Sequence, residues 1–267
     1  MTMPVPPFLY GTAWKEDRTA ALVKEALGGG FRGIDTANQR RHYFEAAVGE
    51  GIRASGVPRE ELFIQTKFTY AESQDHRLPY DPRADFPTQV RQSFASSLEH
   101  LGVDTIDSYI LHGPRAHRGL SDADWEVWRT MEALHREGRT RAIGVSNVSA
   151  EQLELLCAQA EVRPAFVQNR CFARFGWDRE VREVCRREGV TYQGFSLLTA
   201  NARELQSPAV REIAARHGRT IAQVAFRFAL QVGMVCLTGT TDPRHMREDL
   251  AVLEFELTDE EVRTMER

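Results

Sequence analysis

Short apolar segments alternate along the chain with longer stretches in which hydrophobic residues recur every three or four positions. The second pattern places hydrophobic side chains on one face of a helix, as for Val90, Phe94, Leu98 and Leu101. The apolar segments are typical of buried strands and span residues 8–11, 31–35, 62–67, 106–112, 141–147, 165–169, 191–195 and 234–239. The chain is therefore predicted to contain eight strands separated by amphipathic helices.

Strands that alternate with helices pair in parallel, because each helix carries the chain back to the edge where the previous strand began. Eight such units in 267 residues fit a closed barrel better than an open sheet. No Pro/Ser-rich linker, low-complexity tract or block of like charge divides the chain. We therefore predict a single domain of the α/β class, a (β/α)8 TIM barrel over residues 1–267.

Gly28, Gly30 and Gly33 match the spelling of the dinucleotide-binding fingerprint GxGxxG. The fingerprint requires a strand before the glycines and a helix after them, so that the helix N-terminus meets the pyrophosphate. Here the glycines close a predicted helix and enter a predicted strand, which is the reverse order. We therefore interpret them as a helix C-cap followed by a tight turn.

Composition and charge exclude several classes of protein. Hydrophobic residues make up 42% and charged residues 27% of the chain, which is typical of a globular protein. The net charge of −4 argues against a nucleic-acid partner, and no apolar run reaches the length of about 18 residues that a membrane span needs. The segment MTMPVPPFLYGTAW lacks the basic and apolar regions of a signal peptide, so we expect none.

The four cysteines are scattered and form no Cys-x-x-Cys pair; they are Cys157, Cys171, Cys185 and Cys236. We expect reduced, mostly buried thiols of a cytoplasmic protein rather than disulfides or metal ligands. The sequence predicts no metal site. It leaves the oligomeric state open, and a monomer is compatible with it.

Polar residues follow seven of the eight predicted strands, at the point where each strand ends. They are Asp35-Thr36, Lys67, His112, Ser146-Asn147, Gln168-Asn169, Ser196 and Thr238/Thr240. One such pair alone is usual in a loop. In a parallel barrel, however, the carboxyl ends of all strands meet at one face, which is where active sites lie. The ring of polar residues therefore predicts a site there.

Lys67 is the most informative of these residues, because only three of the 34 lysines and arginines are lysines: Lys15, Lys24 and Lys67. A lysine at a strand end in so arginine-rich a chain indicates a role that the planar guanidinium cannot fill, although a lysine reaching to solvent is the alternative. Asp35 ends an apolar strand and needs a partner, for which Lys67 on the next strand is the natural choice. His112 ends the strand after that.

The motifs that contain these residues occur in a recognisable order. They are GT (11–12), GIDTA (33–37), FIQTK (63–67), YILHGP (109–114), GVSN (144–147), VQN (167–169) and GFSLL (194–198). In this order the chain resembles the aldo-keto reductase family, from Gly11 to a tail helix at residues 258–266. The resemblance implies a (β/α)8 barrel that binds a nicotinamide cofactor and a catalytic tetrad of Asp, Tyr, Lys and His.

By this resemblance Asp35, Lys67 and His112 are catalytic, but the tyrosine is displaced. The family spacing after DTA leads to Arg40, and counting back from Glu45 leads to His42. An insertion has lengthened this turn. We assign Tyr43 as the acid, with His42 and then Tyr70 as alternatives.

The resemblance also implies the mechanism: NAD(P)H reduces an aldehyde or ketone while the tyrosine gives a proton to its oxygen. An unperturbed tyrosine has a pKa of about 10, and we expect the Lys67 ammonium to lower the pKa of Tyr43. Asp35 would keep Lys67 charged, and His112 would donate a hydrogen bond to the carbonyl oxygen.

The resemblance assigns a set of cofactor-binding residues. Ser146, Asn147 and Gln168 would hold the carboxamide, Phe195 would stack on the nicotinamide, and Ser196 and Leu198 would line the pyrophosphate path. Gly11, Thr12 and Asp35 also belong to this set.

The segment LTGTTDPRHMRED departs from the family, because Gly239 and His245 stand where a lysine and an arginine usually grip the adenosine 2′-phosphate. Thr240, Thr241 and a helix beginning near Pro243 still offer a phosphate site, with Arg244 or Arg247 as charge partner. Asp249 completes the cofactor-binding set. On balance the sequence favours NADP(H) over NAD(H).

The substrate is expected to be a small carbonyl compound of unspecified identity. We expect its pocket to be built from Trp14, His42, Phe68, Tyr70 and the irregular segment 69–87, with Trp14 equally suited to the core. The chain ends at Arg267, soon after the tail helix, so the long C-terminal loop of many family members is expected to be missing.

Two other functions stay open at this point. Lys67 at a barrel strand end could form a Schiff base, as in an aldolase, although an adjacent Asp35 would keep it charged. The displaced tyrosine leaves room for a barrel that binds cofactor as a regulatory sensor with little turnover.

Overall fold

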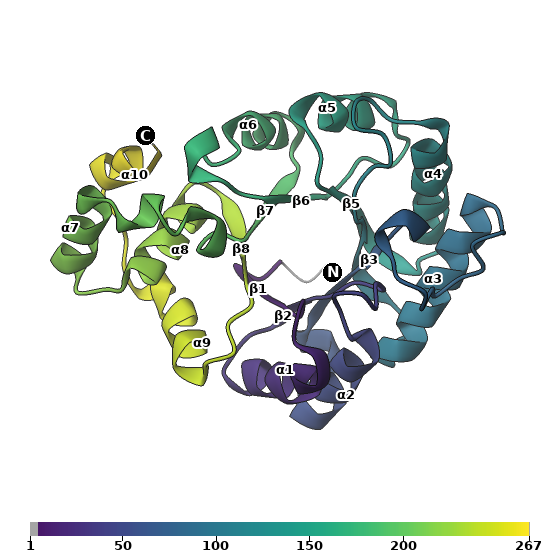
Figure 1. The fold of residues 1–267 in the computed structure, drawn as a ribbon, viewed down its shortest axis with the longest axis horizontal. Helices are drawn as coiled ribbons and strands as arrows, with labels where there is room; N and C mark the ends of the chain where they lie inside the picture. Colours follow the sequence, from purple (N-terminus) through teal and green to yellow (C-terminus); the bar gives the residue numbers. More distant parts are fainter. Residues whose placement is uncertain (1–4, 267) are drawn as a thin grey trace.

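A computed structural model describes residues 5–266, in which eight parallel strands close into a barrel in chain order. The strands are β1 (Phe8–Gly11), β2 (Gly33–Asp35), β3 (Phe63–Phe68), β4 (Ile106–Leu111), β5 (Thr140–Ser146), β6 (Phe166–Arg170), β7 (Thr191–Phe195) and β8 (Met234–Thr238). Strand β1 pairs with both β2 and β8, which closes the ring (Figure 1). The predicted fold class is confirmed; residues 1–4 and 267 of the predicted domain lie outside the described residues.

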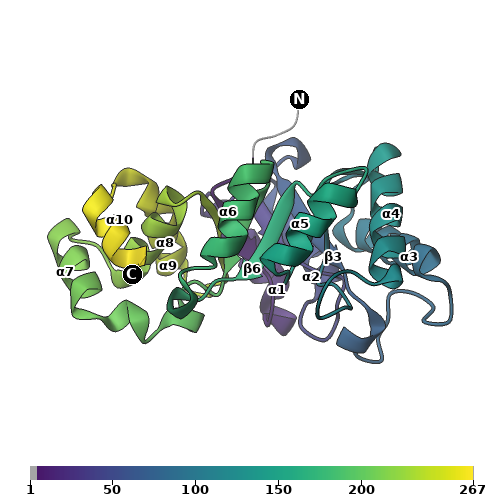
Figure 2. The ribbon, with the colours of Figure 1, turned by 90° about the horizontal axis from the view of Figure 1, so that it is seen from above.

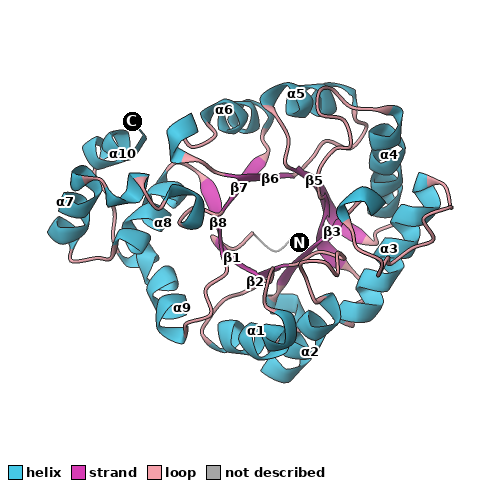
Figure 3. Ribbon diagram, in the orientation of Figure 1, coloured by secondary structure: helices cyan, strands magenta, loops and turns pink. Residues whose placement is uncertain are grey.

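Helices form an outer ring around the strands (Figure 3). Within the described residues they are α1 (Thr19–Gly28), α2 (Glu45–Ser55), α3 (Phe86–Leu101), α4 (Asp122–Arg136), α5 (Ala150–Gln159), α6 (Arg179–Glu188), α7 (Pro208–His217), α8 (Ile221–Gln231), α9 (Pro243–Leu250) and α10 (Asp259–Glu266). Both α7 and α8 lie between β7 and β8 along the chain. Helices α7 and α10 contact each other outside the ring (Figure 2).

The glycine-rich turn has the structure expected from its order. Helix α1 ends at Gly28 and strand β2 begins at Gly33. Gly30 has a φ of 109°, a backbone conformation that a residue with a Cβ rarely adopts. The segment therefore ends a helix instead of opening one, and it does not form a dinucleotide fingerprint.

Side chains alternate between the two faces of each strand and form two hydrophobic cores, one inside the barrel and one between the strands and the helices. On β3, Phe63 belongs to an inner apolar cluster with Leu9, Ile110, Phe166, Val235 and Leu237, whereas Ile64 and Phe68 pack in the outer core against the helices. Successive side chains of a strand point to opposite faces. Residues 63, 65 and 67 therefore face the barrel interior. An apolar layer lies at the amino end of the interior, with polar side chains above it toward the carboxyl end.

The structure also bears on the predictions about membrane spans, metal sites and cysteines. Within them no helix is both long and apolar enough to cross a membrane. No group of three or more His, Cys, Asp or Glu side chains in this part of the chain could hold a metal ion. All four cysteines are free and buried.

Close packing of α2 against α3 gives a stability prediction. A Cβ at Gly49 would lie 2.0 Å from the carbonyl oxygen of His100, whereas a Cβ at Gly28 would meet nothing within 4 Å. Gly49→Ala is expected to lower the free energy of unfolding by about 1–3 kcal/mol through overpacking. Gly28→Ala is expected to change it by less than about 1 kcal/mol, in the stabilising direction. Equal melting temperatures for the two variants would contradict this packing.

Candidate active site

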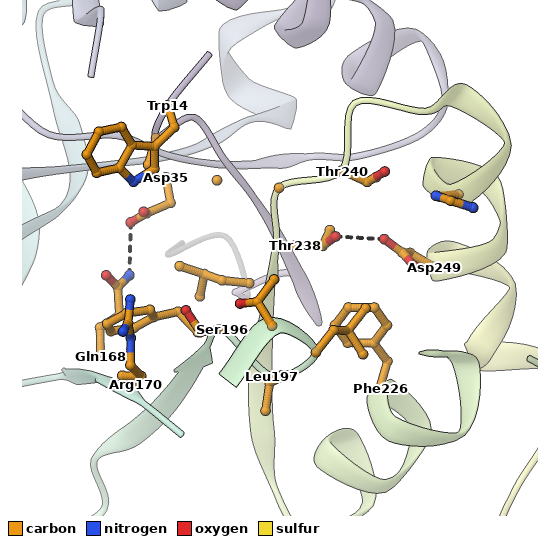
Figure 4. A pocket seen from close by; sticks show the side chains of 18 of the residues that line it. Trp14, Asp35, Gln168, Arg170, Ser196, Leu197, Phe226, Thr238, Thr240 and Asp249 are labelled. Atoms are coloured by element: carbon orange, nitrogen blue, oxygen red, sulfur yellow. Dashed lines mark hydrogen bonds between the residues drawn. The ribbon is translucent and has the colours of Figure 1, made fainter. Parts of the chain in front are cut away.

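A cavity of about 740 Å³ opens at the carboxyl ends of the strands, on the face where the ring of polar residues predicted a site. Figure 4 shows Asp35 and Gln168 on one side of it and Thr240 and Asp249 on the other. Most of the predicted site residues line this cavity. They are Gly11, Trp14, Asp35, His42, Tyr43, His112, Ser146, Asn147, Gln168, Phe195, Ser196, Leu198, Gly239, Thr240, Arg244, His245 and Asp249.

Lys67 and Asp35 form a buried ion pair beneath the cavity. The ammonium Nζ donates to Asp35 Oδ1 at 2.6 Å and to the backbone carbonyl of Thr36 at 2.8 Å. Lys67 is 0% exposed and Asp35 only 3% exposed. Burial lowers the pKa of Lys67, and the neighbouring carboxylate opposes that effect. The partner that the sequence predicted for Asp35 is therefore the one it has.

Tyr43 lies beside this pair, on the turn between β2 and α2. Its backbone N–H donates to the carbonyl of Gln39 at 3.0 Å. The Lys67 Nζ lies 5.5 Å from the centre of the Tyr43 ring, and the His112 ring lies 6.0 Å from it, edge to face. The structure thus brings the predicted acid together with Lys67 and His112 despite the lengthened turn.

The pKa of Tyr43 as a whole is not lowered, contrary to the expectation from the sequence. Burial and the Asp35 carboxylate raise the pKa of Tyr43 above its usual value. Burial is the larger cause, and the Asp35 carboxylate, 2.6 Å from the Lys67 ammonium, acts in the same direction. Tyr43 is therefore protonated at neutral pH, the form that a proton donor needs.

His42, the first alternative acid, and Arg40, the position to which the family spacing leads, have other neighbours. The His42 ring stacks on Trp14 at 4.1 Å between centroids, and burial lowers the pKa of His42. Arg40 lies over the Phe44 ring and pairs with Glu16 at 3.4 Å. These contacts leave Tyr43 as the phenol that faces the cavity next to Lys67.

Tyr70 and Phe68 do not line the cavity, contrary to the expected substrate pocket. The Tyr70 hydroxyl is buried and donates to Asp124 Oδ1 at 2.9 Å. Phe68 packs against Tyr70 in the outer core. The physical reason is the alternation of β3: because Lys67 faces the barrel interior, the next residue faces the helices.

The imidazole ring of His112 is held in place by a contact at its Nδ1 nitrogen. Its Nδ1 lies 2.7 Å from the Thr69 hydroxyl oxygen, and its backbone N–H donates to the carbonyl of Phe68 at 2.9 Å. Burial, Lys67 and His42 together lower the pKa of His112 to about 3. The imidazole is therefore neutral at physiological pH.

Residues at the ends of β5, β6 and β7 are fixed by local bonds. Asn147 and Ser196 have φ values of 56° and 57°, a strained conformation that recurs at functional sites. The Asn147 amide donates to the carbonyl of His112 at 2.8 Å. The Ser146 hydroxyl donates to the carbonyl of Gln168 at 2.6 Å. The strand ends are thereby tied to one another around the cavity.

Three residues predicted to bind the cofactor do not line the cavity: Thr12, Thr241 and Arg247, the alternative charge partner. Thr12 is fully buried, and its hydroxyl donates to the backbone carbonyl of Asp35 at 3.0 Å. Thr241 is exposed and lies outside the cavity wall. Lys67 also lies behind the wall, and it reaches the site through its contacts with Asp35 and Tyr43.

Several lining residues were not predicted from the sequence. Thr220, Ala222 and Phe226 come from α8 and its N-cap, and α8 is placed by its packing on β8. Arg170 follows Gln168 on β6. Lys15 donates from the loop after β1 to the carbonyl of Gly239. The scarcity of lysines that singled out Lys67 was a signal for Lys15 as well.

Comparison with known proteins agrees with this architecture. Residues 9–267 match the model of the aldo/keto reductase family. The chain is 33% identical over 240 residues to the glyoxal reductase of Bacillus subtilis (strain 168), covering 90% of this chain and 79% of that protein. It is 35% identical over 251 residues to an aldo-keto reductase of Mycobacterium avium (strain 104), covering 94% and 81%.

Solved structures give the same answer. The crystal structure of an aldo/keto reductase from Brucella melitensis superposes with a TM-score of 0.85 at 27% identity, covering 98% of this chain and 94% of that one. The chain therefore belongs to the aldo/keto reductase family, whose members are oxidoreductases that act on carbonyl groups and in general use nicotinamide cofactors.

The cavity residues fit such a cofactor. The Gln168 Nε2 already donates to Asp35 Oδ1 at 2.9 Å and to Gln193 Oε1 at 3.0 Å, which leaves Oε1 as the acceptor facing the cavity. At the other end, a side chain at position 239 would begin 3.4 Å from the Lys15 Nζ, so the glycine leaves room for the ammonium. An amide acceptor at one end and a cation at the other suit a nicotinamide carboxamide and a phosphate.

The lowered pKa of His112 predicts a pH-dependent stability. An unfolded histidine has a pKa near 6.5, so below that pH the unfolded chain takes up a proton that folded His112 refuses until about pH 3. Stability is lost as the pH falls through this window, by at most about 1.4 kcal/mol per pH unit. His112→Gln should remove this part of the dependence in urea unfolding between about pH 7 and pH 5. The exposed His117→Gln is the control, and equal pH dependence in both variants would refute the assignment.

Proposed function

We propose that this protein catalyses the NADP(H)-dependent reduction of an aldehyde or ketone to an alcohol, with Tyr43 as the proton donor. The observation that carries the proposal is the meeting of Tyr43, neutral His112 and the buried Asp35–Lys67 pair at one end of the cavity. Each group has a role in carbonyl reduction that its environment supports.

A reduced nicotinamide, when bound, supplies the hydride. His112 orients the carbonyl: with the Thr69 hydroxyl donating to Nδ1, Nε2 carries the proton and can donate to the carbonyl oxygen. Tyr43 gives its proton to that oxygen. Lys67 stabilises the phenolate that remains, at 5.5 Å from the ring centre, and solvent then restores the proton.

The chain offers two groups of residues to hold the cofactor. Ser146, Asn147, Gln168 and Phe195 surround the inner end, where amide and aromatic groups suit the nicotinamide. Gly11, Ser196 and Leu198 line the middle of the path, and Gly239 and Thr240 border its outer end.

The outer end supports NADP(H) over NAD(H), because Lys15, Arg244 and His245 gather there. Arg244 shares its charge with Glu248 at 3.2 Å. Burial raises the pKa of Asp249 to about 6, which weakens the negative charge on this wall in mildly acidic solution. Lys15 is therefore the main candidate for the phosphate contact.

The relatives support carbonyl chemistry without choosing a substrate. One is named glyoxal reductase and another, from Pseudomonas putida, morphine 6-dehydrogenase. Trp14, 69% exposed, and His42 form one edge of the cavity and would contact a small carbonyl substrate. The four free, buried thiols support the expected cytoplasmic location.

The two other hypotheses have less support. A Schiff-base aldolase needs a neutral amine that substrate can reach, but Lys67 is fully buried and donates to both a carboxylate and a carbonyl. The sensor hypothesis depended on a displaced tyrosine, and Tyr43 lies beside Lys67 and His112.

Removing the Tyr43 hydroxyl tests the assigned acid. Tyr43→Phe is expected to lower kcat for aldehyde reduction by about 10²- to 10⁴-fold, because proton transfer to the product oxygen is lost. Its affinity for NADPH, followed by fluorescence quenching, should stay within about threefold, since the hydroxyl is not a predicted cofactor contact. Tyr192→Phe, whose hydroxyl donates to Asp178 away from the cavity, is the matched control. A large loss in His42→Gln with normal turnover in Tyr43→Phe would move the role to His42.

Removing the Lys15 charge tests the phosphate site. Lys15→Met is expected to weaken NADPH binding by about tenfold, with a smaller effect on NADH, because an ionic hydrogen bond to phosphate is lost. The salt dependence of NADPH binding should also become shallower. Lys24→Met, on the exposed face of α1, is the control. Unchanged NADPH affinity in Lys15→Met would contradict the assigned contact.

A further inference from the structure

Four polar side chains meet in the barrel interior between the apolar layer and the cavity. They come from adjacent pairs of strands in register: Asp35 beside Gln65 on β2 and β3, and Gln168 beside Gln193 on β6 and β7. Gln65 and Gln193 are both 0% exposed. Neither lines the cavity, and neither was singled out from the sequence.

The two buried amides pair with each other across the barrel. The Gln65 Nε2 donates to Gln193 Oε1 at 2.7 Å, and the Gln193 Nε2 donates back to Gln65 Oε1 at 2.9 Å. Such a reciprocal pair satisfies one donor and the acceptor of each amide in a place that water does not reach.

The two glutamines are also hydrogen-bonded to Asp35 and Gln168, the two functional side chains of the same layer. The Gln65 Nε2 also donates to Asp35 Oδ1 at 2.7 Å. The Gln193 Oε1 also accepts from the Gln168 Nε2 at 3.0 Å. Asp35 Oδ1 therefore receives three hydrogen bonds, from Lys67, Gln65 and Gln168.

These bonds determine which way each amide faces. A carboxylate only accepts hydrogen bonds, so Gln65 and Gln168 must present nitrogen to Asp35. Gln193 presents oxygen to both nitrogens. Gln168 is then left with its oxygen toward the cavity, as an acceptor for an N–H donor.

We propose that Gln65 and Gln193 are positioning residues for the site, which rests on the proposed function above. They hold the Asp35 carboxylate against Lys67, and they fix the amide of Gln168 with its acceptor oxygen toward the nicotinamide carboxamide. They do so from behind the cavity, without touching substrate or cofactor.

A purely structural role would not need this chemistry. The layer below is filled by apolar side chains such as Phe63 and Phe166, which pack the same interior without polar groups. Replacing a buried polar pair by apolar side chains of similar volume is often neutral for stability, whereas replacing one member leaves the other unsatisfied. A variant in which both glutamines are replaced can therefore lose the positioning function without losing stability.

The test compares wild type with Gln65→Met/Gln193→Met, which removes both amides together. We expect it to melt within about 4 °C of wild type, since Asp35 keeps its bonds from Lys67 and Gln168, and each glutamine is removed together with its partner. Its affinity for NADPH should fall about tenfold, while its affinity for 2′,5′-ADP, which lacks the nicotinamide, should stay unchanged. In steady-state reduction, kcat should fall about 10- to 100-fold with the carbonyl KM within threefold.

Gln193→Met alone is the second variant, because it spares the bond between Gln65 and Asp35. It should show the same selective loss of NADPH over 2′,5′-ADP binding, so the inference stays testable if the double variant fails to fold. Variants that bind NADPH and turn over like an active wild type would overturn the positioning role alone. A wild type that binds neither nucleotide would overturn the proposed function and this inference with it. Equal weakening of both nucleotides would reduce the pair to a structural role.

Discussion

The ion pair between Lys67 and Asp35 is the interaction on which the rest of the site depends. The two side chains are buried, and their charged atoms lie 2.6 Å apart. Buried charges are stable only when each is paired with an opposite charge and further hydrogen bonds satisfy the remaining donors and acceptors. The backbone carbonyl of Thr36 accepts a hydrogen bond from Lys67, and the side-chain amides of Gln65 and Gln168 donate to Asp35. Burial raises the pKa of Tyr43 and lowers the pKa of His112, and the pair adds to both effects, through the Asp35 carboxylate at Tyr43 and the Lys67 ammonium at His112.

The barrel makes this arrangement possible because its interior is layered. Apolar side chains at the amino ends of the strands provide the packed core, and inward-facing positions two residues further along carry the polar layer. The cavity lies above, bounded by strand ends that Asn147 and Ser196 bend with positive φ. Rigid strands place the chemistry, and the loops shape access to it.

Much of this could be predicted from the sequence, because the relevant signals are local. Apolar runs predicted the strands to within two residues. The polar residues at the strand ends predicted the site, because the carboxyl ends of all strands in a parallel barrel lie at the same face. The partnership of Asp35 and Lys67 followed from the cost of burying either alone.

What could not be predicted depends on the surroundings of a residue. Phe68 was misplaced because the alternation along β3 turns the residue after Lys67 outward, toward the helices. The pKa of Tyr43 was misjudged because burial of its side chain, the largest cause of the rise, depends on the surrounding fold. Lys15 and the start of α8 reach the cavity through tertiary packing that no local pattern reports.

The most direct test of the central pair is the single-turnover rate of aldehyde reduction by pre-bound NADPH in Asp35→Asn/Lys67→Met. This double variant removes both charges at once, so neither is left buried and unpaired. We expect a cooperative unfolding transition near that of wild type and a reduction rate at least about 100-fold slower, because the Lys67 charge that stabilises the phenolate is gone. A rate within about threefold of wild type would contradict the account.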